Sequence, residues 1–142
     1  MPPKKTNPFK LRDFMGVDPD TIKILTDRGI RTSDQLLSAA ARREPRASLV
    51  RETGIQPQTL LELVRLSDLA RLPGVKGIRA RLYYAAGIDS VEKLAAARPE
   101  PLRLFLEEFV TRTGFNGIPP LPKEVSSTIE NASKLPIIVD ED

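Results

Sequence analysis

The sequence contains no cysteine and no histidine. Without cysteine the chain has neither a disulfide framework nor a thiolate metal site. Without histidine it lacks the commonest general base and the commonest nitrogen ligand for metals. We therefore predict a protein that is not an enzyme and that carries no cofactor and no metal.

Long apolar runs are also missing. No run approaches the length of a membrane span, and the basic residues 1–5 are not followed by the apolar region of a signal peptide. We expect a soluble, cytoplasmic protein that makes no membrane contact. The net charge is only +3, from 22 basic and 19 acidic residues. That balance is compatible with a nucleic-acid partner but does not require one.

The acidic residues form no catalytic pattern. Asp18 stands where it would cap a helix, Glu107 and Glu108 fall on a helical surface, and residues 140–142 are an acidic end. None of these groups pairs with a nucleophile or has metal-ligand spacing, and no nucleotide-phosphate loop is present. The acidic groups therefore add no support for an enzyme.

Apolar residues recur at helical spacing along most of the chain, which predicts an all-α fold. Asp18 before a proline and the Thr32–Gln35 pair are helix-start signals, and Asp89 or Ser90 starts a later helix. We expect Ile78 and Phe105 to face inward. The expected helices cover about residues 9–15, 19–28, 33–40, 45–53, 57–66, 69–72, 77–86, 91–97, 99–113 and 123–133.

Residues 69–88 organise the rest of the chain. Pro73 and Gly74 break one helix, because proline has no amide hydrogen and glycine tolerates left-handed backbone angles. Val75 points back as a hydrophobic plug, and a second helix begins near Gly77. Gly87 ends that helix as a C-terminal cap. The stretch is predicted as helix, tight turn, helix.

The chain repeats itself at an offset of 58 residues. With this shift Gly16 falls on Gly74 and Gly29 falls on Gly87, and two more inserted residues bring later glycines into register. Each half therefore holds two turns of the type Gly-hydrophobic-polar-Pro/Gly, and an internal duplication is indicated. In chain order the first, second, third and fourth turns are residues 16–19, 54–57, 74–77 and 114–117.

The third turn resembles the helix-hairpin-helix motif. Gly74, Val75 and Ala80 match its pattern, whereas Lys76 stands where the second glycine is expected. Paired hairpins resemble the double helix-hairpin-helix domain of repair and recombination proteins. A closer resemblance is to a bacterial helix-hairpin-helix domain family of unknown function, over about residues 29–109. It is carried by TGI at residues 53–55, SDLARLPGV at 67–75 and AAGIDSVEKLAAARPEPL at 85–102.

Repeat and resemblance together predict tandem duplicated double helix-hairpin-helix units, packed as one compact body. The expected divisions are a flexible basic arm at residues 1–8, a first repeat at 9–66, a second repeat at 67–134 and an acidic tail at 135–142. Within that tail, Pro136 to Val139 are suited to docking as an extended segment.

In DNA-binding hairpins of this class, glycines let backbone amides approach a phosphate at a helix N-terminus. Here Lys76 adds positive charge, no acidic residue occurs between residues 69 and 88, and Tyr83 is placed to stack on Arg79. Our leading hypothesis is a non-catalytic module that binds double-stranded DNA with little sequence preference. The predicted contact residues are Gly74, Val75, Lys76, Gly77, Arg79, Arg81 and Arg71.

The alternative is a protein-interaction or scaffolding module, with a homo-oligomer compatible with either hypothesis. The turns depart from the double-glycine pattern, the charge is nearly balanced and the chain ends in acids. Arginines on a helix are also common on solvated faces. A second basic cluster is interpreted as a charged helix junction, with an extension of a backbone-binding surface as the alternative, and it comprises Arg42, Arg43, Arg46 and Arg51.

Overall fold

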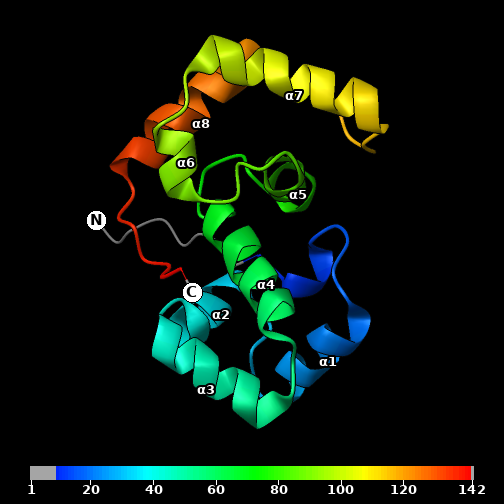
Figure 1. Cartoon of the computed structure of the whole chain (residues 1–142), viewed down its shortest axis with the longest axis vertical. Helices are drawn as coiled ribbons and strands as arrows, with labels where there is room; N and C mark the ends of the chain where they lie inside the picture. Colours follow the sequence, from blue (N-terminus) through cyan, green and yellow to red (C-terminus); the bar gives the residue numbers. More distant parts are fainter. Residues whose placement is uncertain (1–8, 142) are drawn as a thin grey trace, which may run out of the picture.

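The computed structural model describes residues 9–141, and the predicted arm at residues 1–8 lies outside them. The described chain is all-helical and contains no strand, as the sequence predicts (Figure 1). No helix within residues 9–141 combines the length and apolar content that a membrane span requires. The elements are a short 3₁₀ helix η1 (Leu11–Asp13) and the α-helices α1 (Pro19–Asp27), α2 (Ser33–Ala40), α3 (Arg43–Thr53), α4 (Pro57–Leu69), α5 (Gly77–Ala85), α6 (Val91–Ala95), α7 (Pro99–Thr113) and α8 (Pro122–Lys134).

Helix α4 lies at the centre of the molecule. Figure 1 shows α1, α2 and α3 around one end of it and α6, α7 and α8 beyond the other. Leu60, Val64, Leu66 and Leu69 of α4 are completely buried. Full burial of such a side chain contributes about 1.5–3 kcal/mol, so this one helix anchors much of the core. The predicted division between residues 66 and 67 falls inside α4, which both halves therefore share.

Several helix starts carry the predicted caps. The Asp18 carboxylate accepts hydrogen bonds at the start of α1. Thr32 and Gln35 form the complete capping box of α2. Of the two candidates before α6, Ser90 is the cap, because its hydroxyl accepts from the Lys93 amide at 3.0 Å. Such caps typically contribute about 1 kcal/mol each.

The end of α5 copies the end of α1. After each helix a glycine adopts a positive φ, +81° at Gly29 and +93° at Gly87. The next amide then reaches back to the helix in the same way, from Ile30 to the Leu25 carbonyl and from Ile88 to the Tyr83 carbonyl, both at 2.9 Å. The bounds of α5 also lie 58 residues after those of α1. The duplication itself stays a prediction.

The first segment differs from the expected helix at residues 9–15. Only the three residues of η1 are helical. The reason is a pairing with the segment before α2, because the Leu11 amide donates to the Arg31 carbonyl at 3.0 Å and the Ser33 amide to the Phe9 carbonyl at 2.7 Å. These long-range bonds hold the backbone extended where apolar spacing alone favours a helix.

Residues 135–141, which we name the strap, run from the end of α8 back to α2 and α3 (Figure 1). They form no helix, and the Asp140 amide donates to the Ala41 carbonyl at 2.9 Å. The segment predicted as a tail therefore ties the two ends of the molecule together.

Candidate functional site

The third turn has the predicted backbone. Gly74 has a φ of +79°, a value that L-residues rarely adopt. The Val75 amide donates to the Leu72 carbonyl at 3.1 Å, and the Val75 side chain is buried in the core. The plug expected from the sequence is therefore in place. The expected short helix at residues 69–72 is instead the last residue of α4 and a turn.

Gly77 is a glycine because another part of the backbone passes close to it. A Cβ built there would overlap the carbonyl oxygen of Asp13 and lie 3.1 Å from the Phe9 ring. The N-terminal segment therefore packs directly against the start of α5. Internal packing accounts for this glycine without a ligand.

Lys76 is exposed and immediately precedes α5. It is the N-cap residue, and its side chain makes no capping hydrogen bond. The first amides of a helix lack partners within the helix, so an uncapped start leaves them open to solvent or a ligand. This part of the predicted site remains accessible.

Each arginine of the predicted site is paired with a carboxylate in the structure. Arg79 pairs with Glu124 of α8 at 3.0 Å and donates to the Ile118 carbonyl at 2.8 Å. Arg71 pairs with Asp68 at 2.7 Å, and a second bond reaches the Pro136 carbonyl of the strap at 2.9 Å. Both side chains are largely covered.

Arg81 is the most enclosed of the three arginines. It pairs with Glu62 of α4 and donates from Nε to the Met15 carbonyl at 2.6 Å. Its guanidinium also lies 5.5 Å from the centre of the Tyr84 ring. The absence of acids between residues 69 and 88 therefore does not leave the arginines unpaired, because α4 and α8 supply them.

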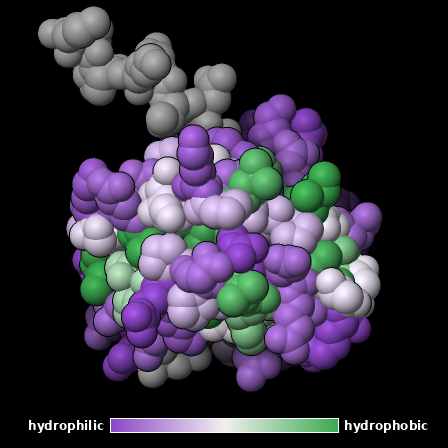
Figure 2. Space-filling view, turned by 90° about the horizontal axis from the view of Figure 1, so that it is seen from above, coloured by the Kyte–Doolittle hydropathy of each residue, from purple (hydrophilic) through white to green (hydrophobic). Residues whose placement is uncertain are grey.

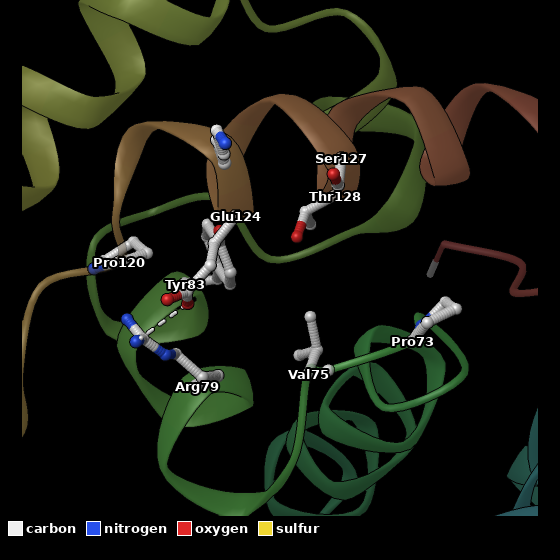
Figure 3. A pocket seen from close by; sticks show the side chains of 10 residues that line it. Pro73, Val75, Arg79, Tyr83, Pro120, Glu124, Ser127 and Thr128 are labelled. Atoms are coloured by element: carbon white, nitrogen blue, oxygen red, sulfur yellow. Dashed lines mark ion pairs between the residues drawn. The ribbon is translucent and has the colours of Figure 1, made fainter.

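A pocket of about 250 Å³ adjoins the third turn (Figure 3). The turn and α5 form one wall and α8 forms the other, with Arg79 and Glu124 joined across one end. The pocket was not predicted, although the three-and-four spacing of α8 marks the helix that closes it. Its lining residues are Pro73, Gly74, Val75, Arg79, Tyr83, Pro120, Lys123, Glu124, Ser127 and Thr128.

Tyr83 forms part of the inner wall of this pocket and is only 1% exposed. Burial raises its pKa, and a hydrogen bond with Thr128 opposes that rise. The phenol is therefore neutral near pH 7. The predicted stacking partner for Arg79 is thus engaged with α8, and the cation over a tyrosine ring is Arg81 over Tyr84.

Exposed aliphatic side chains surround the same turn. Ile78, Leu121 and Ile118 are 53%, 64% and 79% exposed. The expectation that Ile78 faces inward is wrong, because α5 buries Ala80, Leu82 and Tyr83 instead. On α7 the expected inward residue Phe105 is likewise 43% exposed, since Leu102 and Leu106 take the buried positions.

On the face that Figure 2 shows, the hydrophobic residues do not merge into one broad patch. Figure 2 shows the face seen from above, where hydrophobic residues occur in separate places among hydrophilic ones. Near the third turn, however, Ile78 and Gly117 are close neighbours, because a Cβ on Gly117 would lie 3.0 Å from the Ile78 side chain. The fourth turn thus packs beside α5 and carries Ile118 with it.

The chain belongs to the family described as Domain of unknown function (DUF4332), whose model matches residues 15–135. This match is longer than the predicted resemblance and includes the third turn and all of α8. No curated protein and no solved structure matches the chain.

Proposed function

We propose that this protein is a non-catalytic helical module that binds another protein through the third turn and its pocket. One observation carries the proposal: Arg71, Arg79 and Arg81 are each paired with a carboxylate of the body, while aliphatic side chains beside the same turn stay exposed. Arginines held in this way must break an ion pair before they can bind a phosphate. Covering exposed aliphatic groups with a partner removes apolar surface from water, which lowers the free energy of the complex.

The pocket chemistry supports an apolar anchor. Pro73, Val75 and Pro120 offer hydrocarbon surface, and Tyr83 closes the inner wall (Figure 3). Interfaces commonly centre on one apolar side chain that fills such a pocket, with polar groups around the rim. We propose that the partner inserts an aliphatic or aromatic side chain here and covers Ile118 at the rim.

We further propose that the architecture is a duplicated pair of helix-hairpin-helix units. The support is that equivalent glycines share left-handed angles: φ is +78° at Gly16 and +79° at Gly74, and +75° at Gly54 and +68° at Gly114. Thr53 and Thr113, just before the latter pair, each donate to the carbonyl four residues earlier at 2.6 Å.

Double-stranded DNA is the second candidate partner, and one observation favours it. Lys76 at the uncapped start of α5 and Lys123 in the first turn of α8 both adjoin the pocket region, and both are exposed. Two cations beside open helix amides suit a backbone phosphate. In this case residues 74–77 contact the DNA backbone without reading bases.

Two matched substitutions separate the candidates. Ile118→Asp places a charge on the apolar rim, and Lys76→Glu reverses the charge at the turn. Light scattering measures self-association. The protein-binding proposal is supported if Ile118→Asp abolishes this association and Lys76→Glu leaves it intact. Fluorescence anisotropy with a short duplex supports DNA if affinity falls steeply with salt and drops about tenfold with Lys76→Glu. A chain that neither associates nor binds duplex at low salt contradicts duplex binding and a second copy of this chain as the protein partner.

A further inference from the structure

The strap places a carboxylate on the start of α3. Arg42 is the N-cap residue of α3, and its side chain forms no cap. The Asp140 carboxylate takes that role, because it accepts from the Arg43 amide at 3.0 Å and from the Arg42 guanidinium at 3.3 Å. These bonds hold the pKa of Asp140 below its ordinary value. A residue distant in sequence thus supplies the helix cap.

A buried arginine forms the floor under the strap. Arg46 is 3% exposed and donates to the carbonyls of Ala40 and Ala41 at 3.2 and 3.0 Å. Its other nitrogen donates to the Asp140 carbonyl at 2.6 Å. The predicted charged helix junction therefore holds the strap by its backbone, and the acidic side chain adds a second set of contacts.

Three more arginines reach the same segment. Arg43 donates from Nε to the Glu141 carbonyl at 3.2 Å, and Arg65 lies 3.8 Å from the Glu141 carboxylate. Arg71 donates to the Pro136 carbonyl. Opposing charge near Arg65 comes from Asp89, 4.0 Å away. The surface around α3 and α4 is therefore built to hold an extended acidic segment.

The apolar part of the strap is held less firmly than its end. Ile137 is 60% exposed, and Ile138 and Val139 are half-buried. Leu135, Ile138 and Val139 pack partly against the core, so lifting the strap exposes only the part of their surface that is now covered. The family match ends at residue 135, so it contains the arginines of this surface but not the strap that fills it.

We propose that the surface formed by Arg42, Arg43, Arg46 and Arg65 is a docking site for an extended acidic segment, and that the strap of a second copy of this chain docks there by exchange. The covalent connection between the strap and the body runs through Leu135. The contacts that the strap makes within one chain can therefore also form between two chains. Exchange of an identical element is a low-cost route to a dimer. This contact is separate from the pocket at the third turn, so Ile118→Asp leaves it unchanged.

Charge reversal on each side of the contact provides the test. Asp140→Lys sets a cation against the arginines, and Arg42→Glu with Arg43→Glu sets acids against the wild-type strap. Each full-length variant opposes its own strap by charge, whereas its body matches the strap of the other in charge. We expect a heterodimer by sedimentation velocity when the two are mixed, and mainly monomer from each alone. Combining all three substitutions in one chain restores the contact and removes the need for a partner.

A peptide with the sequence of residues 135–142 separates the site from its occupant. We expect it to bind the Asp140→Lys protein about tenfold more tightly than wild type, whose own strap competes. A peptide carrying Asp140→Lys should not bind. Failure of the wild-type peptide to bind a variant that circular dichroism shows to be folded overturns the docking site. Peptide binding without a heterodimer overturns the second copy as occupant.

Discussion

The first and third turns share a left-handed glycine but have opposite chemistry. Gly16 and Gly74 share a left-handed φ, and each turn leads into a helix. At the first turn Asp18 caps α1, so the helix start is closed by its own carboxylate. At the third turn Lys76 leaves α5 uncapped. A shared left-handed glycine therefore does not mean equal function, because the side chain at the helix start decides whether its amides are available.

The two turns also touch through one side chain. Arg81 of α5 donates to the Met15 carbonyl beside the first turn, and a Cβ on Gly16 would lie 3.2 Å from its Nε atom. The arginine that the sequence assigns to a ligand thus joins the turns to each other. The following predictions test how far the resemblance between the turns extends, beginning with the largest expected effect.

Gly77→Ala should lower the free energy of unfolding by about 2–4 kcal/mol. The new methyl group would overlap the Asp13 carbonyl oxygen, a backbone atom that cannot move aside without shifting η1. Urea denaturation followed by circular dichroism measures the change. The matching position of the first turn is Pro19, which is exposed, and Pro19→Ala should cost less than about 1 kcal/mol. Equal losses at both positions would contradict the proposed close packing.

Arg81→Met should destabilise the protein by about 1–3 kcal/mol, because it leaves Glu62 and the Met15 carbonyl without their partner. A double-mutant cycle with Glu62→Gln isolates the ion pair. Arg103→Met is the control, since the ion pairs of that arginine are with Glu100 and Glu107 of its own helix. A coupling energy near zero would show that the ion pair adds nothing to joining α5 and α4.

Exchanging the caps should move stability in opposite directions. Asp18→Ala removes the cap of α1 and should cost about 1 kcal/mol. Lys76→Asp supplies a cap to α5 and should add about 0.5 kcal/mol, through a new hydrogen bond and a favourable charge at the helix start. Thermal denaturation at neutral pH detects both. Loss of stability with Lys76→Asp would mean that the third turn cannot adopt the capped geometry of the first.

The smallest expected effect concerns Tyr83, whose counterpart 58 residues earlier is the buried Leu25. Burial raises the pKa of Tyr83 above its ordinary value of 10.0, and Tyr84 is raised in the same way. The folded state therefore favours the neutral phenol. The contribution of the raised Tyr83 pKa to the stability of the folded state is complete below pH 10. It is lost as the pH rises through the folded-state pKa.

Melting temperatures are measured between pH 9 and pH 12, in steps of about one pH unit. They should fall more steeply with rising pH for wild type than for Tyr83→Phe. Tyr84→Phe serves as the control for the less buried ring. Identical slopes for wild type and Tyr83→Phe would show that Tyr83 ionises as freely in the folded protein as in the unfolded chain.

Local signals in the sequence predict much of the fold. Asp18, the Thr32–Gln35 box and Val75 all behave as expected, because caps and turns depend on neighbours within a few residues. Ile78 and Phe105 do not, since helical spacing leaves more than one apolar face and the choice depends on which helices pack nearby. The pocket could not be predicted from the sequence for the same reason, because α8, a distant part of the chain, forms one of its walls.

The sequence by itself determined most of the helices, the caps at Asp18, Thr32 and Ser90, and the left-handed corners, because each follows from the conformational preferences of a few adjacent residues. Only the tertiary structure decided what the arginines do. Glu62 and Glu124 reach Arg81 and Arg79 through packing, and Asp140 reaches α3 through the strap. Charge pairing acts through space, so the fold determines which basic side chains remain accessible to a partner.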